Sequence, residues 1–279
     1  MIKSLMVGLD GSEHALAAGA YALWLAEKLD AKVTALHIID LAAIEGTFYH
    51  DISGSLGFEP YLDMSSKIRT ALKERGEIIL QAFAEQAAAA NLKIDTINRI
   101  GVVANEIAEV ARTADLVLIG HRGINEKFST GLLGSTAESI TRKSPKPVFV
   151  TPMEFRPCEN PVLAYDGSNK SAAVMHDAAE FCTQLGTPLT VLTVDHEEAR
   201  GHEHLEEAGK YLESYDLDVR LELQRTGNTP ERIANFIREK EHDLLFIGAY
   251  GHSRIIEMVL GSTTEYVLRN AECPVYVHR

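Results

Sequence analysis

Apolar runs alternate with amphipathic stretches from the first residues of the chain onward. Residues 3–9 are mostly apolar, residues 13–29 carry apolar side chains at helical spacing (Leu16, Ala20, Leu23 and Ala26), and a second apolar run follows at 32–38. Short apolar runs of this kind are typical of strands buried on both faces of a parallel sheet. The pattern predicts a βαβ unit with a right-handed crossover, and it places Asp10 where it can cap the helix.

The same alternation continues to the end of the chain. It predicts strands near 3–9, 32–38, 93–99, 115–119, 147–151, 161–165, 188–194, 218–224, 243–247 and 274–278, and helices near 13–29, 63–90, 103–112, 135–143, 169–185, 200–214, 229–241 and 261–270. Residues 41–66 interrupt the alternation with glycines, a proline and four aromatic residues, namely Phe48, Tyr49, Phe58 and Tyr61. This insert predicts a partly ordered loop that acts as an interface or a covering flap rather than as a lid.

The second half of the chain repeats the first. Asp10-Gly11-Ser12 recurs 156 positions later as Asp166-Gly167-Ser168, and residues 115–120 recur as 243–248. Internal repetition on this scale indicates two related units. We predict domains at 1–153 and 157–279, joined by a short linker, each an α/β domain with a parallel sheet covered by helices on both faces. The apolar fifth strands, at 148–150 and 275–277, would otherwise expose their edges, so we expect the two modules to pair through them.

Composition narrows the class of protein. The chain has 279 residues, of which 46% are hydrophobic, and a formal net charge of −13. That charge argues against nucleic-acid binding, which depends on Lys and Arg side chains at phosphates. No apolar run approaches the ~18 residues of a membrane span, and the first residues lack the pattern of a secretory signal. Three cysteines without metal or disulfide spacing favour a reducing compartment. We therefore expect a cytoplasmic protein without nucleic-acid or membrane partners.

The candidate chemistry follows the fourth strand of each module. In the second module, Gly248, Gly251, Gly261 and Ser262 lie between an apolar strand and a helical pattern. Glycines let the backbone approach a ligand, and a helix start offers unpaired N–H groups and the positive end of a dipole, so the stretch suits a phosphate. A capping box between Ser262 and Glu265 would explain part of the stretch without any ligand. The first module has the matching residues Gly120, Gly123, Gly134 and Ser135, with ten residues instead of nine between the second and third glycines.

The pattern G-x2-G-x9-G-[ST], with an aspartate after the first strand, resembles the universal stress proteins in both halves of the chain. The resemblance implies two tandem doubly wound domains, each a five-stranded parallel sheet of order 3-2-1-4-5, with the family's dimer imitated by the two modules. It also implies ATP as the ligand. The adenine would lie near Val194 and Ile38, the ribose and phosphates over the glycine loop, and Asp166 would face the ribose or a phosphate-bound Mg²⁺.

The implied nucleotide-binding residues fall into two sets. Those of the second module are Ala164, Asp166, Val194, Gly248, Gly251, His252, Gly261, Ser262 and Thr263, and those of the first are Asp10, Ile38, Gly120, Gly123, Gly134 and Ser135. The extra loop residue disturbs the pattern in the first module, whereas His121, Arg122 and Lys127 in the same loop favour an anion there. Hydrogen bonds fail over shorter distances than charge attraction does, so we rank the second site first.

Three functions stay open from the sequence. The protein is a nucleotide-dependent regulatory or interaction module of the stress response, a slow ATPase or phosphotransferase that uses the same pocket, or an interaction protein with vestigial pockets. No nucleophile is paired with a general base, so no catalytic residue is predicted. His202 and His204 diverge by about 200° on a helix, so we favour a solvated acidic helix start over a metal site near His196. The protein partner is unknown, and a further homodimer through the insert at 48–61 is open.

Overall fold

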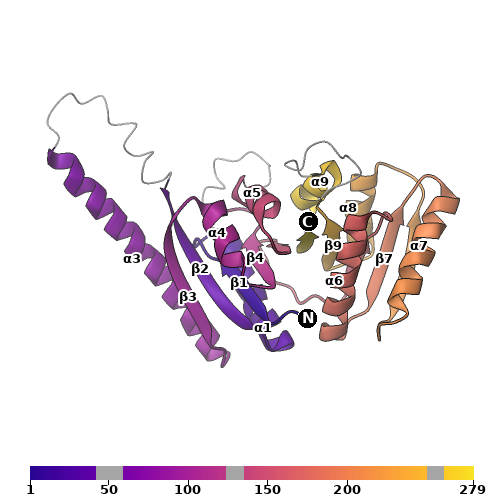
Figure 1. Cartoon of the computed structure of the whole chain (residues 1–279), viewed down its shortest axis with the longest axis horizontal. Helices are drawn as coiled ribbons and strands as arrows, with labels where there is room; N and C mark the ends of the chain where they lie inside the picture. The colour runs from indigo at the N-terminus through magenta and orange to yellow at the C-terminus, as the bar shows by residue number, and fades with distance from the viewer. Residues whose placement is uncertain (42–58, 124–134, 250–260) are drawn as a thin grey trace.

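The computed structural model describes residues 1–41, 59–123, 135–249 and 261–279, and it folds them as strands alternating with helices (Figure 1). The first module contains β1 (Ser4–Gly8), α1 (Glu13–Leu29), β2 (Lys32–Asp40), α3 (Glu59–Ala89), β3 (Ile94–Gly101), α4 (Val103–Ala111), β4 (Leu116–Gly120), α5 (Ser135–Lys143) and β5 (Val148–Thr151). The second contains β6 (Pro161–Ala164), α6 (Asn169–Leu185), β7 (Leu189–Val194), α7 (Glu198–Leu212), β8 (Val219–Gln224), α8 (Thr229–Glu239), β9 (Leu244–Gly248), α9 (Ser262–Asn270) and β10 (Val275–His278).

The strands form one sheet in the order β3-β2-β1-β4-β5-β10-β9-β6-β7-β8. Pairing within each module is parallel. Each module thus has the strand order 3-2-1-4-5, and the two orders face each other across the middle of the sheet. The predicted fold class of two doubly wound domains is confirmed.

The middle of the sheet joins the modules through their fifth strands, as the sequence predicted. β10 pairs antiparallel with β5, with Tyr276 opposite Phe149 and a valine pair on each side. The ring of Phe181 on α6 packs against both, with centroids 6.5 Å from Phe149 and 6.1 Å from Tyr276. The edge that each module would expose alone is therefore covered by the other module.

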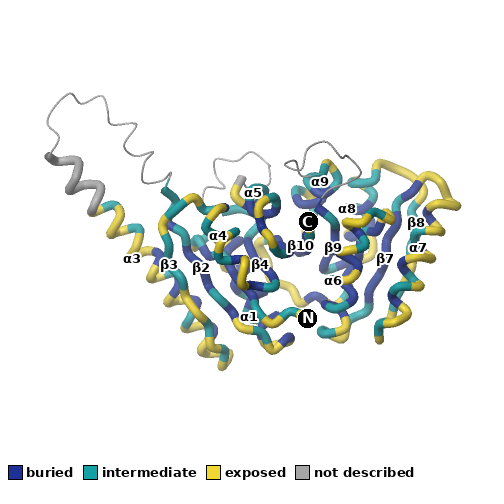
Figure 2. The backbone as a smooth tube through the Cα atoms, viewed as in Figure 1, coloured by how far each residue is buried: buried dark blue, intermediate teal, exposed yellow. Residues whose placement is uncertain are grey.

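Each face of the sheet carries one hydrophobic core that runs through both modules. Alternate strand residues serve the two faces: Leu5 and Val7 belong to the core with α1, α3, α6 and α7, whereas Met6 belongs to the core with α4, α5, α8 and α9. This alternation is why the strands read as continuous apolar runs. The buried backbone in Figure 2 follows the strands and the inner sides of the helices.

The insert in the first module ends earlier than the sequence predicted. α3 begins at Glu59, so the predicted loop at 41–66 ends earlier than expected, because residues 59–66 belong to the first turns of that helix. The remaining insert residues, 42–58, with Phe48, Tyr49 and Phe58, lie outside the described residues.

The linker between the two modules packs against α1. The Arg156 N–H donates to the Tyr21 hydroxyl at 3.1 Å, and the ring of Phe155 lies 4.8 Å from that of Tyr21.

The three cysteines form no disulfide. Cys158, Cys182 and Cys273 are buried free thiols, and burial raises the pKa of Cys182 and of Cys273 to about 12. They are therefore packing groups rather than reactive thiolates. In the part of the chain that the structure describes, no helix has both the length and the apolar character to cross a membrane.

Candidate functional site

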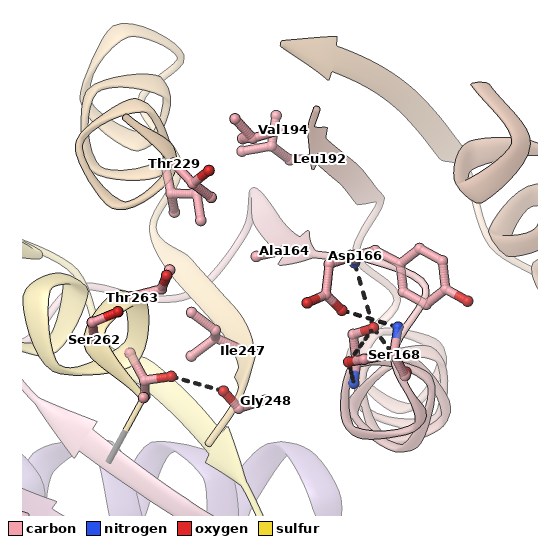
Figure 3. Close-up of a pocket in the computed structure, with 15 residues that line it drawn as sticks. Ala164, Asp166, Ser168, Leu192, Val194, Thr229, Ile247, Gly248, Ser262 and Thr263 are labelled. Atoms are coloured by element: carbon pink, nitrogen blue, oxygen red, sulfur yellow. Dashed lines mark hydrogen bonds between the residues drawn. The ribbon is translucent and has the colours of Figure 1, made fainter. Parts of the chain in front are cut away.

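A pocket of about 280 Å³ opens at the carboxyl ends of β6, β7 and β9 in the second module (Figure 3). β6 and β9 are neighbours in the sheet although they are far apart in the chain. The connections from these two strands leave in opposite directions, which is the point where open α/β sheets bind ligands. The lining residues are Ala164, Tyr165, Asp166, Ser168, Ser171, Leu192, Val194, Thr229, Ile233, Ile247, Gly248, Gly261, Ser262, Thr263 and Thr264.

The pocket has an apolar part and a polar part. Ala164, Leu192, Val194 and Ile247 come from the strand ends, and Ile233 reaches in from α8. The polar part is made of Asp166 and of hydroxyl groups at the starts of α6, α8 and α9. A ligand with a flat apolar portion and an anionic portion matches this division.

Asp166 and Ser168, in the Asp-Gly-Ser turn after β6, form one wall of the pocket. Gly167 has φ +72°, a left-handed conformation that favours glycine. The turn lets the Ser168 N–H donate to Asp166 Oδ1 at 3.0 Å, while Ser168 Oγ accepts from the Ser171 N–H at 3.2 Å and caps α6. The geometry fixes Asp166 beside the pocket.

The first module has the same turn, and there the predicted cap of α1 was wrong. Gly11 has φ +83°, the Ser12 N–H donates to Asp10 Oδ1 at 2.9 Å, and Ser12 Oγ accepts from the Ala15 N–H. Asp10 was expected to cap α1, but the cap is Ser12. The helix begins at Glu13, as predicted, so its N-cap position falls on Ser12, two residues after Asp10.

The start of α9 leaves its N–H groups available to the pocket. Gly261 is the N-cap residue, and no side chain of the described residues caps this helix start. Ser262 is already helical, and Glu265 accepts from Arg269 instead of turning back to the cap. The capping-box alternative is therefore wrong, and the first-turn N–H groups have no intrahelical partner.

A hydrogen bond ties α9 to the end of β9. Thr264 Oγ1 donates to the Gly248 carbonyl at 2.8 Å, and the Gly261 N–H donates to the Ala249 carbonyl at 3.2 Å. The helix start is thus held at a fixed distance from the strand. Sequence reasoning missed Thr264, although its place two residues after Ser262 was visible.

Sequence reasoning also missed the contribution of α8. Thr229 and Ile233 line the pocket, and Asn228, at the N-cap, makes no side-chain cap bond. A second helix start without a side-chain cap therefore lies at the same pocket, besides the capped start of α6. The Asn-Thr-Pro sequence marks a helix start, but only the sheet order brings that start beside β9.

Two of the predicted glycines have a packing role. A Cβ at Gly248 would lie 3.1 Å from Lys170 Cβ, and one at Gly120 would lie 2.7 Å from His14 Cβ. Both glycines let the helix after the first strand pack against the end of the fourth strand. The absence of a Cβ at each glycine allows this close approach.

Most of the site residues predicted in the second module lie together in the structure. Seven from the second module line one pocket: Ala164, Asp166, Val194, Gly248, Gly261, Ser262 and Thr263. Gly251, His252 and Gly134 lie outside the described residues. In the first module Ile38 lies in β2, Gly120 ends β4 and Ser135 begins α5, while a Cβ at Gly123 would lie 2.8 Å from Asp10 Oδ2.

No metal cluster forms among the described histidines and acids. His202 Nε2 lies 3.9 Å from Glu198 on the exposed side of α7, whereas the imidazole of His204 packs beside Gly167 and the ring of Tyr165. The two histidines therefore point apart, as their helical spacing predicted.

Comparison with known proteins identifies the family to which the chain belongs. The profile described as the universal stress protein family matches residues 1–152 and 160–279. The chain belongs to the universal stress protein family. A universal stress protein of Synechocystis sp. is 29% identical over 288 residues and spans the full length of both chains. One of Methanocaldococcus jannaschii is 32% identical over 152 residues, covering 54% of this chain and 82% of its own.

A solved universal stress protein shares the complete fold. The crystal structure of one from Archaeoglobus fulgidus has a TM-score of 0.75 with 22% identity, and the match covers 99% of this chain and 98% of that chain. This chain is thus a tandem universal stress protein with two family domains, and the strand order agrees with that assignment.

Proposed function

We propose that the second module binds an adenine nucleotide, ATP, and that occupancy of the pocket makes this universal stress protein a regulatory or interaction module. The observation that carries the proposal is the combination, in one pocket, of an apolar strand-end wall with two helix starts that lack side-chain caps. Uncapped helix starts attract anionic groups through their N–H groups and dipoles.

The roles of the residues follow from this division. Val194 and Ala164, with Leu192 and Ile247, offer an apolar wall for the adenine. Ser262 and Thr263 offer N–H and hydroxyl donors for phosphates. The volume of about 280 Å³ lies near the lower end of the ~300–1,000 Å³ usual for small-molecule sites. On the sequence pattern, Gly251 and His252 would complete the phosphate side.

The oxygen atoms that line the pocket include a carboxylate that could contact a nucleotide-bound Mg²⁺. Asp166 is the one carboxylate among the described residues that line the pocket. Mg²⁺ takes oxygen ligands, keeps several waters and is usually held by one or two carboxylates plus substrate phosphates, so the residues fit an ion carried by the nucleotide. Asp166 would orient such an ion or accept from the ribose.

We also propose that bound ATP is turned over slowly. Asp166 Oδ1 already accepts from the Ser168 N–H, and the described lining offers no lysine or arginine to stabilise charge on a transferring phosphoryl group. We expect steady-state hydrolysis below about one per second, at the bottom of the usual enzyme range. A Gly261→Val variant measured in parallel identifies a contaminating ATPase, since that activity would not change.

Mass spectrometry of the ligand released from purified, denatured protein tests the binding. Retained ATP supports a binding module, ADP or AMP would indicate turnover, and no nucleotide would support vestigial pockets. Calorimetric titration of the apo protein with ATP completes the test. We expect Gly261→Val, which adds a branched side chain at the N-cap, to reduce affinity at least about tenfold, or about 1.4 kcal/mol.

A further inference from the structure

A second cavity, of about 300 Å³, lies between the two modules. The first module contributes the start of α1, the turn after β4 and the end of β5, and the second contributes the end of α9 and the start of β10. The antiparallel pairing creates this junction because it sets Val275 of β10 opposite Val150 of β5. Its described lining shares no residue with the nucleotide pocket of the second module.

Basic side chains from both modules line the cavity. His14, His121 and Arg122 come from the first module, and Arg269 comes from the second. The imidazole centroids of His14 and His121 are 6.2 Å apart. Arg269 donates to Glu265 through Nη2, while its buried Nε has no hydrogen-bond partner among the described residues.

The described lining of the cavity is poor in acidic side chains. Among the described residues that line it, Glu272 is the one carboxylate. Its side chain is 83% exposed and reaches toward Arg238, at 4.0 Å, so it belongs to the rim. Two guanidinium groups, one from each module, therefore line a partly enclosed junction whose described carboxylate lies at the rim.

We propose that this cavity binds a small phosphate-bearing anion that joins the two modules. Guanidinium groups bind phosphate through paired N–H···O bonds, and here one guanidinium comes from each module. His121 and Arg122 were expected to favour an anion in the first module's own nucleotide site. In the structure they line the junction instead, so the proposed site takes residues from both modules.

The repeat supplies a matched comparison. His121 and Arg122 correspond, at an offset of 128, to Ala249 and Tyr250, so the sequence of the second copy lacks this basic pair. Arg269 corresponds to Arg142, which forms the same i,i+4 ion pair in α5, with Glu138 at 3.5 Å. Arg142→Gln therefore removes an equivalent helix ion pair without touching the cavity.

Calorimetric titration of the full chain with inorganic phosphate tests the proposal. We expect Arg122→Gln and Arg269→Gln each to weaken phosphate binding about tenfold or more, because each removes one charge-assisted pair of bonds. Arg142→Gln should keep the wild-type affinity within about twofold. Arg122→Lys, which retains the charge but loses the planar fork, should lose less than Arg122→Gln.

Three outcomes would overturn the site: no phosphate binding by the wild type, wild-type affinity in both cavity variants, or a loss in Arg142→Gln as large as in those variants. Loss in Gly261→Val with intact binding in the arginine variants would place the phosphate in the nucleotide pocket instead. A parallel titration with glycerol 3-phosphate identifies the source of the group. Tighter binding of the ester indicates an organic phosphate, and equal affinities indicate free phosphate.

Discussion

Single residues repeat their structural roles in the two modules. Ser12 and Ser168 cap α1 and α6, and in both turns the preceding glycine is left-handed and the aspartate accepts from the serine N–H. The sequence allowed the three-residue repeat to be recognised. It did not show which side chain caps the helix, because Asp and Ser are both good N-caps and the glycine conformation decides between them.

The left-handed glycine of the second module gives a prediction at this scale. A Cβ at Gly167 would lie 2.6 Å from His204 Cδ2, whereas Gly186, with φ +68°, has nothing within 4 Å. Gly186→Ala should cost about 1–2 kcal/mol of unfolding free energy, the strain of the left-handed conformation alone. Gly167→Ala should cost about 1–3 kcal/mol more, because the imidazole must move from a packed position. Urea denaturation of both variants measures the difference, and equal costs would contradict it.

Elements meet at the pocket in ways that local sequence does not encode. The strand ends at Ala164 and Val194 were expected there because a strand's end is readable from its apolar run. Thr229 and Ile233 were missed because α8 joins the pocket through the sheet order alone. The first turn of α9 could be interpreted either as a capping box or as an anion site, and the N-cap at Gly261 together with the pairing of Glu265 with Arg269 excludes the capping box.

The bond between α9 and β9 carries a prediction. Thr264→Val removes the hydroxyl that donates to the Gly248 carbonyl and leaves that carbonyl unsatisfied, so we expect a loss of about 1–3 kcal/mol in stability and a smaller ATP-induced rise in Tm. Thr141→Val is the matched control, since Thr141 donates only to Ala137 within α5. An unchanged response to ATP in Thr264→Val would show that the tie does not position the helix start.

The start of α7 predicts a pH dependence. Arg200 donates two hydrogen bonds of 2.7 Å to Asp195, and these bonds lower the pKa of Asp195 to about 2. A lowered carboxyl pKa contributes stability above the unfolded pKa, and that contribution is lost as pH falls toward 2. The stability difference between wild type and Asp195→Asn should therefore be full above about pH 4 and shrink below it. Glu197→Gln, at an exposed carboxylate, is the control that should show a smaller difference.

The two modules should differ in nucleotide affinity. Ala137 occupies the place of Thr264 in the first module, so the hydroxyl that ties the helix start to the strand in the second module is missing there. We expect Gly251→Val with Gly261→Val to abolish most ATP binding in calorimetry, and Gly123→Val with Gly134→Val to leave most of it. The reverse result would place the stronger site in the first module.

At the scale of the whole molecule, the repeat was the most informative signal in the sequence. It predicted two modules of one fold, and the apolar fifth strands predicted how they join. The inter-module cavity could not be predicted, because it depends on bringing His121 beside the end of α9, 148 positions from Arg269 in the chain. Such a contact follows from the antiparallel junction and not from any local pattern.

The junction gives the last prediction. In the whole chain Phe149 and Tyr276 are almost fully buried, and Phe181 and Tyr21 pack around them. The segment 157–279 expressed alone would expose the β10 edge and the rings of Phe181 and Tyr276, which face Phe149 in the whole chain, and each large apolar side chain returned to water costs about 1.5–3 kcal/mol. We expect it to pair with a second copy through β10, since an antiparallel edge is self-complementary, or to lose several kcal/mol of stability. Sedimentation equilibrium and urea denaturation measure both effects.

The same segment with Tyr276→Asp should not pair, because the carboxylate would be buried at the centre of the contact. A monomeric segment as stable as the intact chain would mean that the joined strands contribute nothing to folding.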